Sequence, residues 1–489
     1  MESRLPRAAL WAGAALVLGA WALSSLSVLD DDPFVMGEVA QHVVAGKRLY
    51  ATIWDNKPPL AILIYALPQL VASGSYLGLQ LTGGLWALAQ AWLWLALCPG
   101  GSRVVRVGGA ALLALLPLSD FRFAWLSSED ASNGFALVAL LGAYRSFDSG
   151  RIAPRDALLM GAALALAFHA RQTSALLGLP CLVSLALAEE SPRRKLEGAA
   201  WLAAGGLAAW AAVIALVLAV GDFRGYVYAV FVAPGRYAGQ PRGLIELVSE
   251  FRNSWSTFAI AAAVGFLQIV PRVRLFAAAV GAATLLSAVA PMRAHFHYWE
   301  QVIPGLVLLA HMVARELAPT RRALWALAML PAFVLANVGW TLAKCVTDRS
   351  TARAAAAARA IDSQARPGDH LFVGGKNAGT IYFFTRTEPA NMYFWEYYLY
   401  GVAGVLPTPL ETVLAQYREH PPEILVLGDD MLGAVRAAPS GSENVVVKLI
   451  RDWFAQRDYD AVELAAAAPW HVYRLEGLSP PRETPRSGS

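Results

Sequence analysis

The sequence predicts a mainly helical, polytopic membrane protein with a small soluble α/β domain at its C-terminal end. The chain has 489 residues, enough for more than one domain. Apolar residues make up 57% of it and charged residues 16%, against about 45–50% and about 25% in soluble proteins. Long uncharged runs recur through its first two thirds. These features exclude a soluble globular enzyme, a disordered chain and a disulfide-rich secreted domain.

Eleven uncharged stretches predict membrane-spanning helices. A span needs about 17–25 residues, so the shorter stretches must include flanking polar residues or be shielded by neighbouring helices. The first stretch follows Arg4 and Arg7 and could also be a cleaved signal peptide, but an uncleaved anchor fits the many later spans better. The stretches are 8–29, 77–97, 107–119, 131–144, 157–168, 172–188, 198–220, 254–270, 275–292, 301–310 and 323–343.

Basic clusters in the loops predict the orientation of these spans. No charge occurs between Lys57 and Arg103, so either one or two spans could fit there. If 58–73 lies in the membrane interface and only 77–97 crosses, every basic cluster falls on the N-terminal side, as the positive-inside rule requires. We therefore expect eleven crossings, a cytoplasmic N-terminus and an external C-terminus, in a bacterial inner membrane. The clusters are Arg103/Arg106, Arg145/Arg151/Arg155, Arg193/Arg194/Lys195, Arg272/Arg274 and Arg315/Arg321/Arg322.

The composition changes after residue 345. An Ala/Arg-rich helix is expected at 352–366, and amphipathic patterns predict helices at 410–419 and 446–456. Short strands are expected at 370–373, 424–427 and 472–474. The sequence therefore predicts a transmembrane domain over 1–345, a soluble extracytoplasmic α/β domain over 346–478 and a disordered tail over 479–489.

Charge and cysteine content indicate no further class of ligand. The 40 basic and 36 acidic residues leave a net charge of +4, which argues against a nucleic-acid partner. Of the three cysteines, Cys98 and Cys181 lie in apolar runs, so a disulfide framework is not expected. Cysteine and histidine spacings typical of a metal site are also missing.

Acidic residues follow the first predicted span. Asp30, Asp31 and Asp32 are costly at the end of a span unless they have a role. A short amphipathic helix is expected over 34–45, and Lys57-Pro58-Pro59-Leu60 then leads back toward the membrane. The plain alternative is a solvated loop in which the acids cap the helix N-terminus.

This loop resembles the first external loop of GT-C-type glycosyltransferases, above all the protein O-mannosyltransferases and lipid A aminoarabinose transferases. The likeness extends in weaker form over residues 1–345. It implies a polyprenyl-phosphate-linked sugar donor in the lipid bilayer, a lipid, glycan or protein acceptor on the extracytoplasmic face, and inverting transfer. The matching residues are Asp31-Asp32-Pro33-Phe34, Glu38-Val39-Ala40, Gly46, Tyr50 and Lys57-Pro58-Pro59-Leu60.

Sugar transfer of this kind needs few groups. A carboxylate must take the proton of the acceptor hydroxyl, and a cation must hold the phosphate as negative charge builds on it. The resemblance places the key acid at Asp32, with Asp31 as the next candidate. It also places Lys57 near the lipid phosphate, although Lys57 could instead be an interfacial anchor that snorkels.

Three further segments carry candidate site residues. Glu129 and Asp130 open another span on the external side and resemble the family's second-loop acid, which helps to bind the acceptor or a divalent metal ion. Acids at a helix N-terminus are the plain alternative. Arg171 divides a long apolar stretch, so it either faces the sugar-phosphate or lies at an external hairpin tip. Arg293 and His297 resemble the family's Arg…His-Tyr…Pro element near the lipid phosphate.

A transporter or lipid flippase is the alternative class, because a polytopic chain with buried arginines could also be one. Transporters are usually built from paired repeats with broken helices at matching positions. The sequence shows no internal repeat. External acids gathered in loops fit transfer chemistry better.

Overall fold

The computed structural model describes residues 7–28, 30–120, 124–238, 273–291, 295–317, 321–400, 403–437, 444–457 and 459–475. The chain divides into two compact units, Met1–Arg349 and Ser350–Ser489. The first unit is a helical bundle and the second is built around a small sheet. The division falls after Arg349, and the predicted domains over 1–345 and 346–478 stay a prediction.

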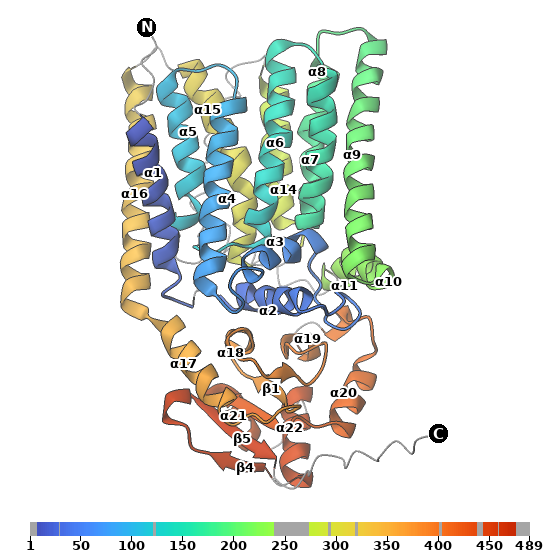
Figure 1. Ribbon diagram of the computed structural model, residues 1–489. Helices are drawn as coiled ribbons and strands as arrows, with labels where there is room; N and C mark the ends of the chain where they lie inside the picture. Colours follow the sequence, from blue (N-terminus) through green and yellow to red (C-terminus); the bar gives the residue numbers. More distant parts are fainter. Residues whose placement is uncertain are drawn as a thin grey trace. The chain divides into compact units, whose positions relative to one another are not determined.

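Long helices lie side by side in the first unit (Figure 1). They overlap every predicted span except 254–270, which lies outside the described residues. The helices are α1 (Arg7–Ser24), α4 (Tyr76–Leu97), α5 (Arg103–Leu115), α6 (Ser128–Ser149), α7 (Pro154–Ala170), α8 (Gly178–Leu187), α9 (Pro192–Val220), α14 (Arg274–Val289), α15 (Ile303–Leu317) and α16 (Arg321–Asp348).

By its own length and composition, one described helix, α9, could cross a membrane. Several of the others are shorter, and some carry polar residues inside the bundle. On α4, for example, Gln80 and Gln90 are both buried. The eleven crossings therefore stay a prediction.

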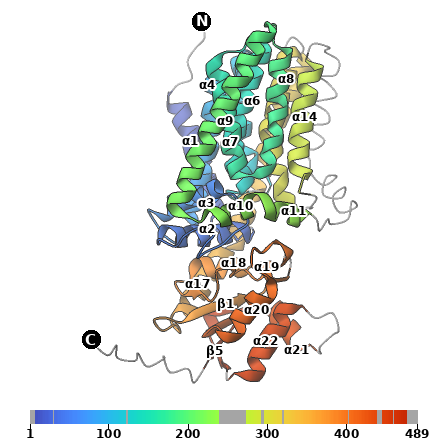
Figure 2. The same cartoon turned by 90° about the vertical axis from the view of Figure 1, so that its right-hand side faces the viewer.

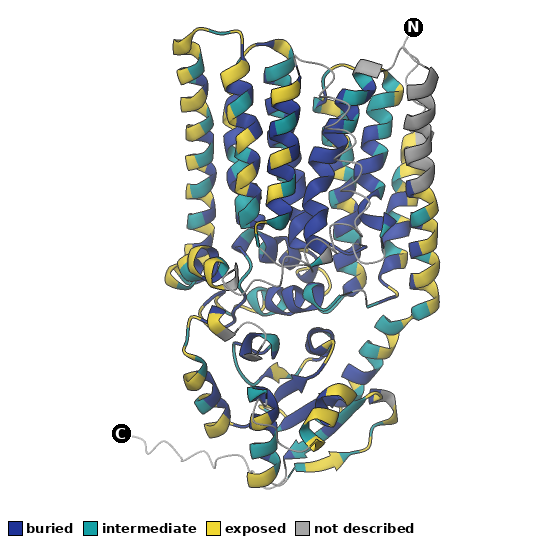
Figure 3. Cartoon of the chain, turned by 180° about the vertical axis from the view of Figure 1, so that it is seen from behind, coloured by how far each residue is buried: buried dark blue, intermediate teal, exposed yellow. Residues whose placement is uncertain are grey.

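Helix α9 packs closely on α7 through small residues. A β-carbon added at Gly161 would collide with the carbonyl oxygen of Leu202, and one at Gly205 with that of Leu158. Glycine at both positions lets the two backbones approach each other, as in membrane helix pairs. Most other side chains of α9 are exposed, whereas the inner helices are largely buried (Figure 3).

Two short helices lie across one end of the bundle, α2 (Asp32–Val44) and α3 (Pro59–Gln69) (Figures 1 and 2). Pro59 is the first residue of α3, a position that proline favours because its fixed φ suits a helix start. The loop between α2 and α3 is tied to the end of α9, because the N–H of Leu49 donates to the carbonyl of Val220 (3.0 Å).

At the same end of the bundle, short helical segments connect the long helices. Figure 2 shows α10 and α11 at the same end of the bundle as α2 and α3. The segments are η1 (Pro117–Ser119), η2 (Gln172–Leu177), α10 (Phe223–Val227), the π-helical η3 (Tyr228–Val232), α11 (Ala233–Ala238) and η4 (Phe296–Val302).

The second unit contains a five-stranded sheet in the order β2-β1-β3-β5-β4. Strand β1 pairs in parallel with β2 and β3, whereas β5 is antiparallel to β3 and β4. The structure has strands at the three expected positions. The strands are β1 (His370–Gly374), β2 (Glu388–Pro389), β3 (Ile424–Gly428), β4 (Tyr459–Val462) and β5 (Trp470–Leu475).

Strands β2 and β4 have no clear signal in the sequence. Strand β2 has two residues, and β4 has no buried position, so neither shows an apolar pattern. The helices of this unit are α17 (Ser350–Asp362), α18 (Ala378–Phe384), α19 (Tyr397–Tyr400), η5 (Ala403–Val405), α20 (Leu410–Glu419), α21 (Asp429–Arg436), α22 (Val445–Gln456) and η6 (Ala465–Ala467).

Candidate active site

Helix ends and loops from distant parts of the sequence meet at the end of the bundle crossed by α2 and α3. Asp32 is the first residue of α2, and Lys57 lies just before α3. Glu129 is in the first turn of α6, Arg171 joins α7 to η2, and His297 lies in η4.

Lys57 and Asp32 form an ion pair. The ammonium Nζ of Lys57 lies 3.1 Å from Oδ2 of Asp32, and the two side chains are only 14% and 15% exposed. The backbone of Lys57 is fixed on both sides. Its N–H donates to Oδ1 of Asp55 (2.8 Å), and its carbonyl accepts from the hydroxyl of Tyr50 (2.8 Å).

The two charges support each other electrostatically. Burial raises the pKa of Asp32, but Lys57, His297 and His295 together lower that pKa more, to about 2. Burial lowers the pKa of Lys57, but the charge of Asp32 raises it above its ordinary value. Both side chains are therefore ionised at neutral pH.

His297 lies between Asp32 and a second carboxylate, Asp30. Its Nε2 is 3.8 Å from Oδ2 of Asp32, and its Nδ1 is 4.0 Å from Oδ2 of Asp30. The imidazole packs edge-on against the rings of Trp125 and Tyr298, with centroid distances of 5.7 and 4.8 Å. Burial, followed by the charge of Asp32, raises the pKa of Asp30 to about 7.

Arg171 and Glu129 form a second ion pair, which is more deeply buried. A guanidinium nitrogen of Arg171 lies 3.0 Å from Oε1 of Glu129, and the side chains are 7% and 1% exposed. The hydroxyl of Ser128 donates to the other oxygen of Glu129 (2.8 Å). The guanidinium carbon of Arg171 lies 4.3 Å from the centre of the Tyr298 ring, within the range of a cation–π contact.

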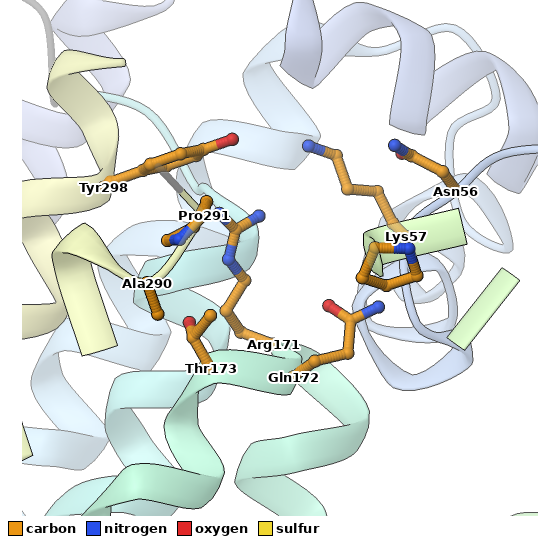
Figure 4. A pocket seen from close by; sticks show the side chains of 9 residues that line it. Asn56, Lys57, Arg171, Gln172, Thr173, Ala290, Pro291 and Tyr298 are labelled. Carbon is orange, nitrogen blue, oxygen red and sulfur yellow. The ribbon is translucent and has the colours of Figure 1, made fainter. Parts of the chain in front are cut away.

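A cavity of about 130 Å³ adjoins both ion pairs. Lys57, Arg171 and Tyr298 extend toward the same space (Figure 4). Two cations and a phenol in a confined space suit an anion such as a phosphate. The cavity is lined by Asn56, Lys57, Arg171, Gln172, Thr173, Pro234, Ala290, Pro291 and Tyr298.

The structure brings five of the sequence-predicted site residues together: Asp32, Lys57, Glu129, Arg171 and His297.

Two of the other three are placed differently. Asp130 contacts Gln90 instead of the cavity, since its Oδ1 accepts from that amide (3.2 Å). Asp31 precedes α2 as its N-cap residue, but its side chain makes no capping hydrogen bond. Arg293 lies outside the described residues, so its contact with the phosphate stays a prediction.

Several site residues are not among the sequence-predicted candidates. Asp30 belongs to the acidic run, but the family motif points to its neighbours. Tyr298 sits in a segment whose aromatic residues are also typical of an interfacial belt. Tyr65 of α3 is fully buried, and its hydroxyl has no hydrogen-bond partner among the described residues. Glu300 is buried and accepts a hydrogen bond from Ser127.

Metal binding stays a prediction. Within the described residues, no group of three or more histidine, cysteine, aspartate or glutamate side chains is arranged to hold a metal ion. The family resemblance associates Glu129 and Asp130 with a metal. In the structure Glu129 forms an ion pair with Arg171, and Asp130 accepts a hydrogen bond from Gln90.

The fold is similar to that of ArnT from Cupriavidus metallidurans. The ArnT structure bound to undecaprenyl phosphate superposes with a TM-score of 0.61 at 13% identity, covering 95% of this chain and 97% of that chain. The apo ArnT structure gives a TM-score of 0.58 at 14% identity and covers 96% and 98% of the two chains. No protein-family model and no curated protein matches the sequence. The likeness shows that the chain has the GT-C fold.

Proposed function

We propose that this chain, which has the fold of ArnT, is a membrane glycosyltransferase. It moves a sugar from a polyprenyl-phosphate donor to an acceptor on the extracytoplasmic face, and Asp32 is the general base. The observation that carries the proposal is the cavity in which Lys57 and Arg171 converge while Lys57 also contacts Asp32. It combines a place for a phosphate with a carboxylate beside it.

The cavity supports a phosphate-linked donor. Lys57 and Arg171 come from segments far apart in the sequence, yet both line it. Each of the two cations is paired with a carboxylate, Lys57 with Asp32 and Arg171 with Glu129, and each also borders the cavity. Charge-assisted contacts from these cations stabilise a leaving phosphate as its charge grows during bond breaking. ArnT, whose fold is similar, is known bound to undecaprenyl phosphate.

Binding of the donor also changes the chemistry of Asp32. In the ion pair with Lys57, the pKa of Asp32 is about 2, so the carboxylate is a weak base. A donor phosphate competes with Asp32 for the Lys57 ammonium. As the ammonium turns toward the phosphate, the proton affinity of Asp32 rises, which suits a general base. The base is thus activated only when the donor is present.

A single general base predicts inversion at the anomeric carbon. The acceptor oxygen attacks from the face opposite the departing phosphate while Asp32 removes its proton. The transition state has oxocarbenium character, as in glycoside hydrolysis without a covalent intermediate. We further propose eleven crossings and an extracytoplasmic position for both this site and the domain that follows residue 345.

Transfer by the purified full-length chain tests the proposal. The chain, in lipid nanodiscs, is given a radiolabelled undecaprenyl-phosphate-linked pentose or hexose and a membrane extract as the source of acceptors. We expect transfer of label from one of the donors, and Asp32→Asn should reduce it by about 100-fold or more. Binding of undecaprenyl phosphate should persist in that variant.

The control is Glu411→Gln, which removes an exposed carboxylate on α20. This variant should transfer label at the unchanged rate. Normal transfer by Asp32→Asn would contradict the assignment of the base. Absence of transfer from both donors would contradict the donor class.

A further inference from the structure

Asp32 occupies a confined position for a group that must gain and lose a proton in every turnover. Its carboxylate is 15% exposed, with the Lys57 ammonium 3.1 Å from Oδ2. His297 approaches the same oxygen at 3.8 Å. A proton taken from the acceptor therefore needs a route away from Asp32 that does not pass through the donor cavity.

His297 offers such a route because its two nitrogens face different carboxylates. Nε2 faces Asp32 and Nδ1 faces Asp30, at 3.8 and 4.0 Å. The ring is 5% exposed and is held between Trp125 and Tyr298, so its plane is restricted. An imidazole between two carboxylates can accept a proton at one nitrogen and release a different one at the other.

Asp30 is suited to the far end of this route. No ion pair joins it to a lysine or arginine among the described residues. Backbone N–H groups of Asp32 (3.1 Å from Oδ1) and Asp31 hold its carboxylate, and its Oδ2 lies 4.0 Å from Nδ1 of His297. Its side chain is 18% exposed. It can therefore pass a proton on to water.

We propose that Asp32, His297 and Asp30 form a proton relay that carries the acceptor's proton away from the site. This inference rests on the proposed function, because it assigns a path to the proton that Asp32 removes. Asp30 acts through His297 and is a positioning residue for proton transfer. It is not a group that touches the sugar.

The relay moves one proton for each sugar transferred. The acceptor oxygen forms a bond to the anomeric carbon while the bond from that carbon to the phosphate oxygen breaks, and the electron pair stays on the phosphate. The acceptor proton passes to Oδ2 of Asp32 and then to Nε2 of neutral His297. The Nδ1 proton passes to Oδ2 of Asp30, which later gives it to water. A flip of the imidazole ring then returns the remaining N–H to the side of Asp30 before the next turnover. Small rotations of the imidazole shorten one contact at a time.

The proton affinities favour this direction. When the departing phosphate releases the Lys57 ammonium to Asp32 again, the pKa of Asp32 returns to about 2, below the value of about 7 for Asp30. Burial lowers the pKa of His297, which favours the neutral ring that can accept a proton. Among the described residues, the titratable and charged groups that face Asp30 and His297 are Asp31, Asp32, Lys57, Tyr76, Glu129, Arg171, His295 and Tyr298.

The first test does not depend on catalysis. Infrared spectra of the purified full-length chain are recorded between pH 5 and pH 9. We expect the stretching band of protonated carboxyl groups to lose intensity as the pH passes about 7, and this loss should be smaller in Asp30→Asn. His297→Gln should shift its midpoint, whereas His370→Gln, at an exposed site in the second unit, should leave it in place. An unchanged band in Asp30→Asn would overturn the relay.

The second test measures transfer of the radiolabelled undecaprenyl-phosphate-linked sugar against pH. The wild-type rate should rise through about pH 7, and Asp30→Asn should lower it by about tenfold or more and remove that rise. Asp30→Glu should restore part of both. Affinity for undecaprenyl phosphate should not change. If Asp32→Asn abolishes transfer but Asp30→Asn keeps the wild-type rate and profile, the relay fails and the proposed function stands. If Asp32→Asn retains transfer, the proposed base fails.

Discussion

Replacing Lys57 by alanine removes one of the two cations that we expect to hold the donor phosphate. Its ammonium is buried, lines the cavity and now contacts Asp32 at 3.1 Å. A charge-assisted hydrogen bond contributes about 1.5–3 kcal/mol, and each 1.4 kcal/mol corresponds to about tenfold in affinity. The donor phosphate must displace Asp32 from the ammonium, which offsets part of the gain. We therefore expect affinity for undecaprenyl phosphate to fall by about tenfold.

The assay is equilibrium binding of undecaprenyl phosphate to the full-length chain in nanodiscs. Lys57→Arg keeps the positive charge and should lose less affinity than Lys57→Ala. Lys47→Ala, which removes a lysine outside the cavity, should bind as the wild type does. Wild-type affinity in Lys57→Ala would refute the argument, because Lys57 would then serve only to hold Asp32.

Three other predictions concern buried charges and topology. Arg171→Ala should lower the thermal unfolding temperature, because removing one partner of a buried ion pair costs about 3–5 kcal/mol. Adding Glu129→Gln to this variant should recover part of the loss, and no recovery would show that the two residues are not coupled. Asp30→Asn should stabilise the chain more at pH 8 than at pH 5. The pKa of Asp30 is raised from 3.8 to about 7, so its carboxyl group destabilises the folded state increasingly as the pH rises between these two values, and by a constant amount above about 7. An equal shift of the unfolding temperature at both pH values would contradict this. A thiol reagent that does not cross membranes should label Thr52→Cys in intact cells and Arg193→Cys only after permeabilisation. The background should be low because the native cysteines are buried. The reverse labelling pattern would show that the topology is inverted.

Local patterns account for the parts of the fold that the sequence predicts well. An uncharged run is visible within a short window, and the helices at 77–97 and 198–220 correspond closely to α4 and α9. The buried strand β3 is likewise a continuous apolar run. Strand β4 has no such pattern, because its positions are exposed or half-buried, so its pairing with β5 depends on tertiary context.

The site depends on which helix ends meet, and that is not a local property. Lys57 and Asp32 are 25 residues apart and are joined only because α2 and α3 cross the same end of the bundle. The family motif identifies Asp32 and Lys57, but it does not reveal that they pair with each other. The importance of Asp30 comes from an imidazole in η4, far along the chain, so no pattern within the acidic run could distinguish it from Asp31.

Transfer of label from an undecaprenyl-phosphate-linked sugar by the purified full-length chain tests the central claim most directly. The measurement compares the wild type with Asp32→Asn and with Glu411→Gln, and records binding of undecaprenyl phosphate in parallel. We predict transfer by the wild type and by Glu411→Gln, with a loss of about 100-fold or more in Asp32→Asn despite retained binding. Binding of the lipid phosphate without transfer from either the pentose or the hexose donor, in the wild type as in Asp32→Asn, would contradict the account.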